Sequence, residues 1–355
     1  MKYRTFIYLL LVLLLFVSPT HSENIIKVKF AHTLPAQSPF GLGAEIFENR
    51  VKERLEGKVN VTVFPQSQLG NNKQILEAIE MNTLEFALIH HYQFTKFSEK
   101  YKVYGLPFLF EDFGTVMQFQ KSEASKQMLS EIEKKAGLKA LGYWNFGMRQ
   151  LSNKQKPIRL PGDVKGLKIR IRSIPQMVDA FKAIGAAPAP LIFAEVYGAI
   201  QTGVIDAQES PLPSFYNFKI YEVQKYITLT NHVYDGYLLV TNRKFWDKLP
   251  DDIKDELFKV SVEVTKLVNK SVVDNSVLTL NKIEKTGTII ISLTGEEIGL
   301  WRKAMQPVWE KYEKEIGRSI FMAAYNSGGT GGGLDPCWLG TCRCNDTSCK
   351  KECCY

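Results

Sequence analysis

The sequence has 355 residues, of which 45% are hydrophobic, and its 45 Lys and Arg residues exceed its 37 Asp and Glu residues to give a formal net charge of +8. The basic residues are scattered rather than gathered in one tract, and neither zinc-finger spacing nor another nucleic-acid signature occurs, so no nucleic-acid partner is expected. About 300 residues of folded chain exceed what one hydrophobic core usually organises, so two lobes are expected.

Residues 1–22 have the composition of a secretory signal peptide. Lys2 and Arg4 precede an unbroken apolar run from Phe6 to Val17, and small residues surround a cleavage point near Ser22. The run is short for a bilayer crossing, which disfavours the alternative of an uncleaved anchor helix. Because no cysteine lies near this point, a lipoprotein is not expected. Removal of the segment lowers the charge to +6, and this weakly basic surface suits anionic ligands but is also common among lysine-rich soluble proteins.

The first elements predict a parallel sheet. A strand is expected over Ile26–Phe30, an amphipathic helix over Ser38–Leu55 and an alternating strand over Val59–Val63. The helix is predicted from apolar residues three and four apart, which are Phe40, Ala44, Phe47, Val51 and Leu55. A strand, a helix and a strand joined by short links form a βαβ unit, so the strands are expected to run parallel.

Two adjacent histidines end the next predicted strand. A helix is expected over Lys73–Met81 and a strand over Phe86–Ile89, followed by His90 and His91. Ligands collect where the strands of open parallel sheets end, but neighbouring strand residues point to opposite faces, so at most one histidine is expected in a cleft. No metal is expected, because nearby residues lack the spacing of a zinc site.

The middle of the chain carries the strongest pattern. After a helix over Ala124–Ala136 and a strand over Leu138–Trp144, the segment Leu167–Arg172 alternates apolar and cationic residues, as in a strand with one cationic face. A solvated face is the favoured interpretation for Lys168 and Arg172. Arg170 and the upstream Arg149 lie in apolar surroundings, where a guanidinium can bind both oxygens of a buried carboxylate.

Four spaced motifs resemble those of one protein family. They are Gly147-Met148-Arg149-Gln150, Gly166-Leu167-Lys168-Ile169-Arg170, Phe193-Ala194-Glu195-Val196-Tyr197 and Gln208-Glu209-Ser210. In this order they resemble the solute-binding subunit of a tripartite ATP-independent periplasmic (TRAP) transporter that captures organic acids. The resemblance covers about residues 26–320 and implies an α/β, two-lobed periplasmic binding protein fold with a hinge and an interlobe ligand cleft. It also implies a periplasmic location, a small organic acid ligand and TRAP membrane subunits as partners.

The resemblance also implies the ligand site. Arg170 would clamp the ligand carboxylate, Arg149 would be a second contact and the ring of Phe193 would stack along the ligand. Members of the family commonly carry asparagine after the Gln-Glu pair, where this chain has Ser210, so a water-mediated contact is expected there. Further ligand-site candidates are Glu209, His90, Thr33 and His232. For His232 the alternative is a structural histidine, and for His90 it is a packed or solvated one.

The remaining elements complete two predicted lobes. Helices are expected over Phe215–Tyr226, Asp251–Asn275, Val277–Lys285 and 296–316, with a strand over Tyr237–Asn242. The last helix carries an apolar stripe that is expected to brace the lobes. Lobe I is predicted to comprise residues 23–146 and 236–275, and lobe II residues 147–235 and 276–325. The chain would cross near Phe146 and Asp235, which predicts rigid lobe closure around a ligand.

The C-terminal segment differs in composition from the rest. A Gly-rich linker at 328–333 precedes a Cys-rich segment at 334–355 that holds all six cysteines: Cys337, Cys342, Cys344, Cys349, Cys353 and Cys354. In an exported chain such a cluster favours a disulfide-stabilised mini-module over a metal-binding or inert tail. Six cysteines allow fifteen pairings. Resemblance to small cystine-stabilised helical peptides implies Cys342–Cys353, Cys344–Cys349 and Cys337–Cys354.

Two classes of function remain open from the sequence. A binding protein is favoured, and no cofactor is expected. An enzyme acting on anionic substrates is less favoured, because the sequence has no Gly-x-Ser-x-Gly elbow, phosphate loop or paired catalytic carboxylates near the arginines. A further alternative is a carrier or precursor of a secreted disulfide-rich C-terminal peptide.

Overall fold

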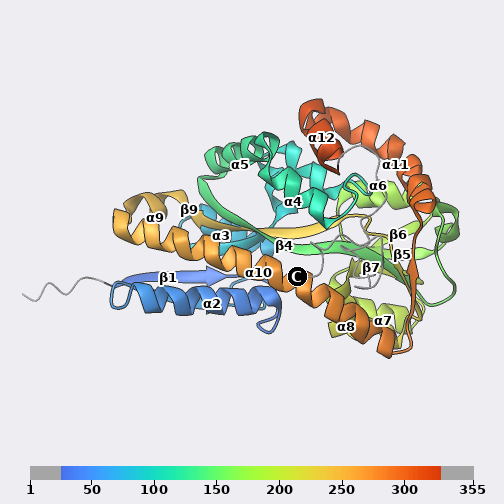
Figure 1. Ribbon diagram of the computed structural model, residues 1–355, viewed down its shortest axis with the longest axis horizontal. Coiled ribbons are helices and arrows are strands. Elements are labelled where there is room, and N and C mark those ends of the chain that lie inside the picture. Colours follow the sequence, from blue (N-terminus) through green and yellow to red (C-terminus); the bar gives the residue numbers. More distant parts are fainter. Residues whose placement is uncertain (1–24, 329–355) are drawn as a thin grey trace, which may run out of the picture.

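The computed structural model describes residues 25–328 (Figure 1). The predicted signal peptide, the linker beyond Gly328 and the six cysteines with their pairings lie outside the described residues. Among the residues that are described, none of the helices has both the length and the apolar character that crossing a membrane requires.

The first half of the chain begins as a βαβ unit, as predicted. Strand β1 (Ile26–Ala31) pairs in parallel with β2 (Val59–Phe64) and β3 (Phe86–His90). Helix α2 (Pro39–Arg54) begins where the Ser38 hydroxyl accepts a hydrogen bond from Gly41 N at 3.1 Å. Its residues Phe40, Ala44, Phe47 and Val51 are buried against the sheet. Helix α3 (Asn72–Glu80) follows with a capping box at Asn71.

Two long strands connect the halves of the molecule. Strand β4 (Leu138–Asn153) pairs antiparallel with β9 (Tyr234–Asn242) as far as Met148, and then with β7 (Ala207–Pro211) and β8 (Tyr226–Leu229). The predicted strand at Leu138–Trp144 was therefore too short. A register shift between Asn145 and Gly147, where Gly147 has φ of +105°, lets the strand change partners without ending.

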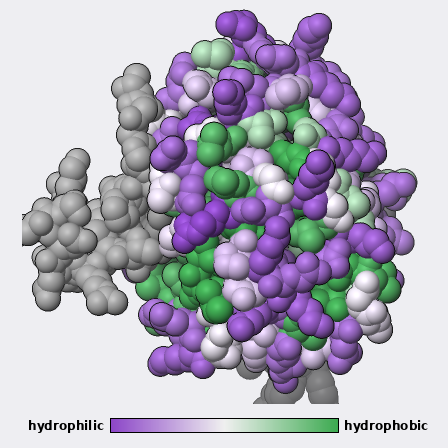
Figure 2. Space-filling view, turned by 90° about the vertical axis from the view of Figure 1, so that its right-hand side faces the viewer, coloured by the Kyte–Doolittle hydropathy of each residue, from purple (hydrophilic) through white to green (hydrophobic). Residues whose placement is uncertain are grey.

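The second half places its strands beside β7. Strand β5 (Lys168–Ile171) lies between β7 and β6 (Ala187–Pro190), and the ten-stranded sheet has the order β2-β1-β3-β9-β4-β7-β5-β6, with β10 (Ile289–Ser292) on β8. Helices α6 (Pro175–Ala183), α7 (Val196–Gln201) and α8 (Leu212–Asn217) flank these strands. From the end of the molecule that carries them, hydrophobic side chains form several separate patches among hydrophilic ones (Figure 2).

The helix predicted over Phe215–Tyr226 is wrong. Helix α8 ends at Asn217, a 3-10 turn covers Ile220–Glu222, and β8 begins at Tyr226. Lys219 adopts φ of +54°, a left-handed conformation that interrupts a helix. The segment is extended beyond the turn because β8 pairs with both β4 and β10, which local periodicity does not reveal.

Helices on the outside connect both halves. After α9 (Arg243–Lys248), the two predicted helices form one helix, α10 (Asp251–Lys285), which packs on α2 and β4 in the first half and on α8 in the second (Figure 1). Helix α11 (Gly295–Ile316) packs on α6 and on the 3-10 segment Glu99–Gly105, so it contacts both halves as expected. Helix α12 (Arg318–Tyr325) packs on α4 (Phe113–Lys121) and α5 (Glu123–Ala136).

Candidate functional site

A cleft of about 930 Å³ is lined by both halves of the molecule. The first half contributes the loop after β1, the start of α3, the end of β3 and the first part of β9. The second half contributes β4, the end of β5, the segment around Phe193 and the end of β7. Six of the predicted ligand-site residues line this cleft: Thr33, His90, Arg149, Arg170, Phe193 and Ser210.

Among residues 25–328, Arg170 is a buried cation without an acid partner. It lies on β5 with 4% of its surface exposed, and its Nε and Nη2 donate to the backbone oxygen of Leu191 at 3.0 and 2.8 Å. Its Nη1 is buried without a hydrogen-bond acceptor. Burial lowers the pKa of the Arg170 guanidinium to about 10, so the group is still charged at neutral pH. A buried N–H that lacks an acceptor is unfavourable, and an anion in the cleft would satisfy it.

The ring of Phe193 supports this guanidinium. The Arg170 carbon Cζ lies 5.1 Å from the ring centroid, and Phe218 meets the same ring edge to face at 4.8 Å. The cation–π contact helps to hold the charge in place without neutralising it. Because Phe193 is half-buried and lines the cleft, its ring forms an apolar surface beside the cation.

Arg149, in contrast to Arg170, is paired with carboxylates of the protein itself. Its Nε and Nη2 hold the Glu209 carboxylate, Nη2 also donates to the Glu209 backbone oxygen at 2.7 Å, and Nη1 donates to Asp235 Oδ2 at 2.6 Å. Burial alone would raise the pKa of Glu209, but Arg149 and, after it, His232 outweigh burial and lower it to about 2. Arg149 therefore stabilises two buried carboxylates and has little capacity left for a ligand.

Arg172 also lies in the cleft, so the prediction that it belongs to a solvated strand face is wrong. Its Nη1 and Nη2 donate to Asp235 Oδ1 and Oδ2, both at 3.0 Å, and Nη1 contacts His90 Nε2. The physical reason is strand alternation, because residues two apart share a face and Arg172 therefore lies on the side of Arg170. Lys168 is exposed, as predicted.

His90 faces the cleft from the end of β3 in its neutral form. Its Nδ1 accepts from the backbone N–H of Tyr92 at 3.2 Å, which leaves Nε2 to donate to Asp235 Oδ1 at 2.8 Å. Burial and the nearby Arg172 lower the pKa of His90 to about 4. His91 packs behind it, with its ring stacked on Tyr234 at 5.3 Å.

The side chains of His90, His91 and Asp235 lie close enough together to hold a metal ion in principle. However, Arg149 and Arg172 both donate to Asp235, and their two positive charges would repel a cation at this point. The arrangement is better explained as a buried ion-pair network.

Two other predicted site residues lie behind the cleft wall. Glu209 is fully buried under Arg149, and His232 Nε2 lies 3.5 Å from Glu209 Oε2 while its Nδ1 shares a hydrogen bond with Thr230 at 2.7 Å. Neither side chain lines the cleft. Ser210 does line it, and its hydroxyl is buried without a hydrogen-bond partner.

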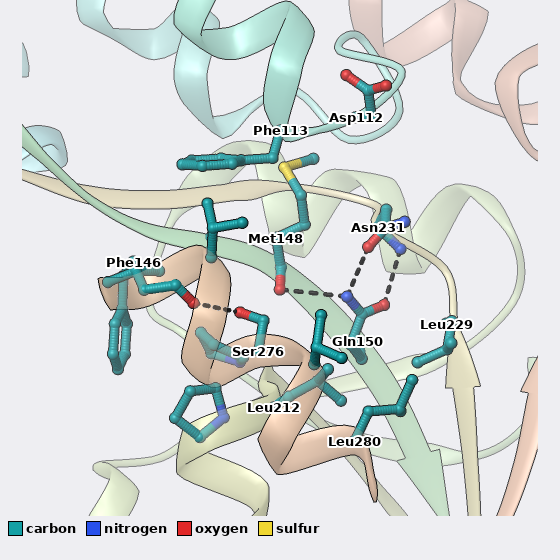
Figure 3. A pocket seen from close by; sticks show the side chains of 16 residues that line it. Asp112, Phe113, Phe146, Met148, Gln150, Leu212, Leu229, Asn231, Ser276 and Leu280 are labelled. Carbon is teal, nitrogen blue, oxygen red and sulfur yellow. Dashed lines mark hydrogen bonds between the residues drawn. The ribbon is translucent and has the colours of Figure 1, made fainter. Parts of the chain in front are cut away.

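A smaller cavity of about 120 Å³ lies between α10, β4 and α8 (Figure 3). Met148, Leu212 and Leu280 give it a mainly apolar wall, and Gln150 is turned toward Asn231, with hydrogen bonds of 2.6 and 2.9 Å. It contains no charged group comparable to Arg170, so it does not compete with the cleft as a site for an anion.

Arg172 and Asp235 were not predicted as site residues from the sequence. Arg172 could have been predicted, because it lies two residues after Arg170 and strand alternation places residues two apart on one face. Asp235 had no such signal, because its partners Arg149, Arg172 and His90 lie far away along the chain.

Comparison with known proteins places these observations in a family. Residues 30–315 match the family described as bacterial extracellular solute-binding protein, family 7. The C4-dicarboxylate-binding periplasmic protein DctP of Vibrio cholerae is 40% identical over 302 residues, covering 84% of this chain and 90% of that protein.

Solved structures of TRAP periplasmic solute-binding proteins are similar to this fold. A TRAP periplasmic solute-binding protein from Shewanella oneidensis with bound succinate has a TM-score of 0.79 at 33% identity, covering 85% of this chain and 99% of that one. One from Pseudomonas aeruginosa with bound L-malate has a TM-score of 0.74 at 34% identity, covering 81% and 100%. The family consists of solute-binding proteins, which argues against the enzyme alternative. The chain thus belongs to family 7 of the bacterial extracellular solute-binding proteins and is a two-lobed α/β periplasmic binding protein of the TRAP type.

Proposed function

We propose that this protein captures a C4-dicarboxylate, such as succinate or L-malate, in the interlobe cleft and delivers it to the membrane subunits of a TRAP transporter. Support comes from relatives that are named for C4-dicarboxylate binding and from similar structures that contain succinate and L-malate. At 33 to 40% identity these relatives share most of the chain's length.

The observation that carries the proposal is the state of Arg170. Among the described residues that line the cleft, it is the buried cation whose charge no carboxylate balances. A ligand carboxylate that accepts from Nη1 and the second N–H of Nη2 would complete its hydrogen bonding and balance its charge. Closure of the lobes would remove water from the cleft, and the ion pair between Arg170 and the ligand carboxylate would then be stronger than in bulk solvent.

The other residues have distinct roles in this proposal. Thr33, His90, Phe193 and Ser210 would limit the size and polarity of the ligand from the cleft wall. Arg149, Glu209 and His232 would hold the wall behind them in place. Lobe I (23–146 and 236–275) and lobe II (147–235 and 276–325) would close over the ligand by bending near Phe146 and Asp235.

A melting-shift screen tests the ligand class. Succinate, L-malate and fumarate should raise the melting temperature of the protein more than lactate, pyruvate or a sugar acid does, because binding stabilises the folded state by mass action. Calorimetry on the strongest ligands should give micromolar to nanomolar affinity, roughly 8 to 12 kcal/mol. A large shift with a sugar acid or keto acid, combined with no response to the C4 diacids, would contradict the proposal.

A further inference from the structure

We infer that Arg172 binds the second carboxylate of the ligand and makes the cleft selective for dicarboxylates over monocarboxylates. This inference rests on the proposed function, because it concerns the far end of the same ligand. It assigns a role to a residue that the family resemblance did not single out.

The spacing of the two arginines suits a short diacid. Arg172 follows Arg170 by two residues, just beyond the end of β5 at Ile171, so strand alternation places both side chains on one face with their Cα atoms roughly 6.6 Å apart. Both residues line the cleft. Two guanidiniums on long side chains that start this close together and line one cleft can bind the two ends of a four-carbon diacid, whereas a monocarboxylate would use one of them.

Arg172 has a free hydrogen-bonding edge. Its Nη1 and Nη2 donate to the two oxygens of Asp235, both at 3.0 Å, and Nη1 also contacts His90 Nε2, which leaves Nε and the second N–H of Nη2. Within residues 25–328, Nε makes no hydrogen bond. That edge presents two parallel N–H groups, the arrangement that binds a carboxylate in bidentate fashion. The side chain is 31% exposed, so the edge is accessible from the cleft.

Arg149 is a poorer candidate for the same role. It already donates four hydrogen bonds to Glu209 and Asp235, so one of its five N–H groups is left, and its side chain is only 4% exposed. No lysine lines the described part of the cleft. Arg170 and Arg172 are therefore the two cations there that can each offer a fork to a ligand.

The charge on Arg172 is also only partly used by Asp235. That carboxylate accepts hydrogen bonds from Arg149 and His90 as well, so Arg172 is one of three donors that stabilise it. Asp235 thereby positions Arg172 without fully neutralising it. A second anion can approach the free edge at a smaller electrostatic cost than it would meet beside a simple one-to-one ion pair.

Calorimetry with succinate and its monoamide, succinamate, tests the inference, because the two ligands have nearly the same size and differ in the second charge. The wild-type protein should bind succinate about 10- to 100-fold more tightly than succinamate. Arg172→Gln should lower succinate affinity by about the same factor and change succinamate affinity less than about threefold. The selectivity for the diacid should therefore largely disappear.

Three variants complete the test. Arg172→Lys keeps the charge but loses the fork, so an intermediate loss of succinate affinity is expected. Arg170→Gln should weaken both ligands alike, and Lys168→Gln, an exposed change in the same strand, should leave both affinities unaltered. Unfolding of the variants is not expected, because Asp235 still has Arg149 and His90 as donors, and circular dichroism checks this.

Two outcomes separate the inference from the proposed function. If Arg172→Gln keeps the full preference for succinate, groups other than Arg172 bind the second carboxylate, and the inference is overturned while the proposed function stands. If the wild-type protein binds neither succinate nor L-malate, the proposed function itself fails, and the inference fails with it.

Discussion

Arg149 and Arg170 lie on strands on either side of β7 and face one cleft, yet their surroundings differ in kind. Arg149 is enclosed by Glu209 and Asp235, whereas Arg170 has a backbone oxygen, an aromatic ring and a buried Nη1 without an acceptor. Burial of an arginine therefore does not by itself mark a ligand contact. A paired guanidinium supports the protein, and an unpaired one requires a partner from outside.

Removing Arg149 should have the largest effect on folding. Arg149→Gln leaves Glu209 and part of the Asp235 charge without their main counter-ion, so the free energy of unfolding should fall by about 3 to 5 kcal/mol. Denaturant unfolding followed by circular dichroism measures this change. Lys168→Gln is the matched control, since its side chain is exposed in the same sheet. Unchanged stability of the Arg149 variant would show that the network around Glu209 is not a structural one.

Removing Arg170 should affect binding rather than folding. Arg170→Ala should lower ligand affinity by about 3 to 5 kcal/mol, because one carboxylate of the ligand would be desolvated without its partner. Arg170→Lys should also bind poorly, since it keeps the charge but loses the planar fork. The unliganded Arg170→Met variant should be as stable as the wild type or more so, because it replaces an unbalanced buried charge.

Calorimetry and thermal unfolding of the same Arg170 variants distinguish the two effects. Affinity of the lysine variant close to that of the wild type would be inconsistent with a bidentate clamp at this position. A large loss of stability in the unliganded methionine variant would place Arg170 with Arg149 among the structural residues.

The ion-pair network that contains His90 and Glu209 should also make the stability of the protein depend on pH. The folded protein keeps the pKa of His90 at about 4, below its ordinary value of 6.5, so from pH 6.5 down to 4 the unfolded chain binds a proton that the folded chain does not. Stability is therefore lost as pH falls through this window, by on the order of 3 kcal/mol for this one group. Glu209, with a pKa of about 2, contributes stability that is lost only between about pH 4.5 and 2.

His90→Gln isolates this contribution. The glutamine amide can still donate to Asp235 but does not titrate, so the slope of unfolding free energy against pH should fall by up to about 1.4 kcal/mol per pH unit between pH 6.5 and 4. Urea unfolding at several pH values gives the slope. An unaltered slope would mean that His90 titrates equally in the folded and unfolded chains.

Local patterns predicted much of this structure, because they act within one element. Alternation over Leu167–Arg172 identified β5, and apolar spacing identified α2 within one residue at each end. Features that depend on distant partners were not predictable in the same way. Strand β4 extends past Trp144 because β7 and β8 pair with its second half, and β8 replaces a predicted helix for the same reason.

The same distinction between local patterns and distant partners applies to the site. Arg170 and Phe193 could be assigned from motifs within a few residues of each, and they do meet in the cleft. The ion pairs that distinguish Arg149 from Arg170 could not be assigned from local motifs, because Asp235 reaches Arg149 from β9 at a separation of 86 residues. Motif resemblance thus located the two arginines but did not reveal that one of them is already neutralised.

The smallest effect on ligand affinity is expected at Ser210. Like Arg170 Nη1, its buried hydroxyl has no hydrogen-bond partner. Ser210→Ala should leave the stability of the unliganded protein unchanged and lower ligand affinity by about 1 kcal/mol, the contribution of one hydrogen bond. Calorimetry with succinate measures the change. Ser210→Asn should match or exceed the wild-type affinity, since the longer amide can reach the ligand without a bridging water. If the alanine variant loses stability but not affinity, Ser210 is part of the supporting wall with Arg149, and an unpaired buried polar atom is not by itself a sufficient sign of ligand contact.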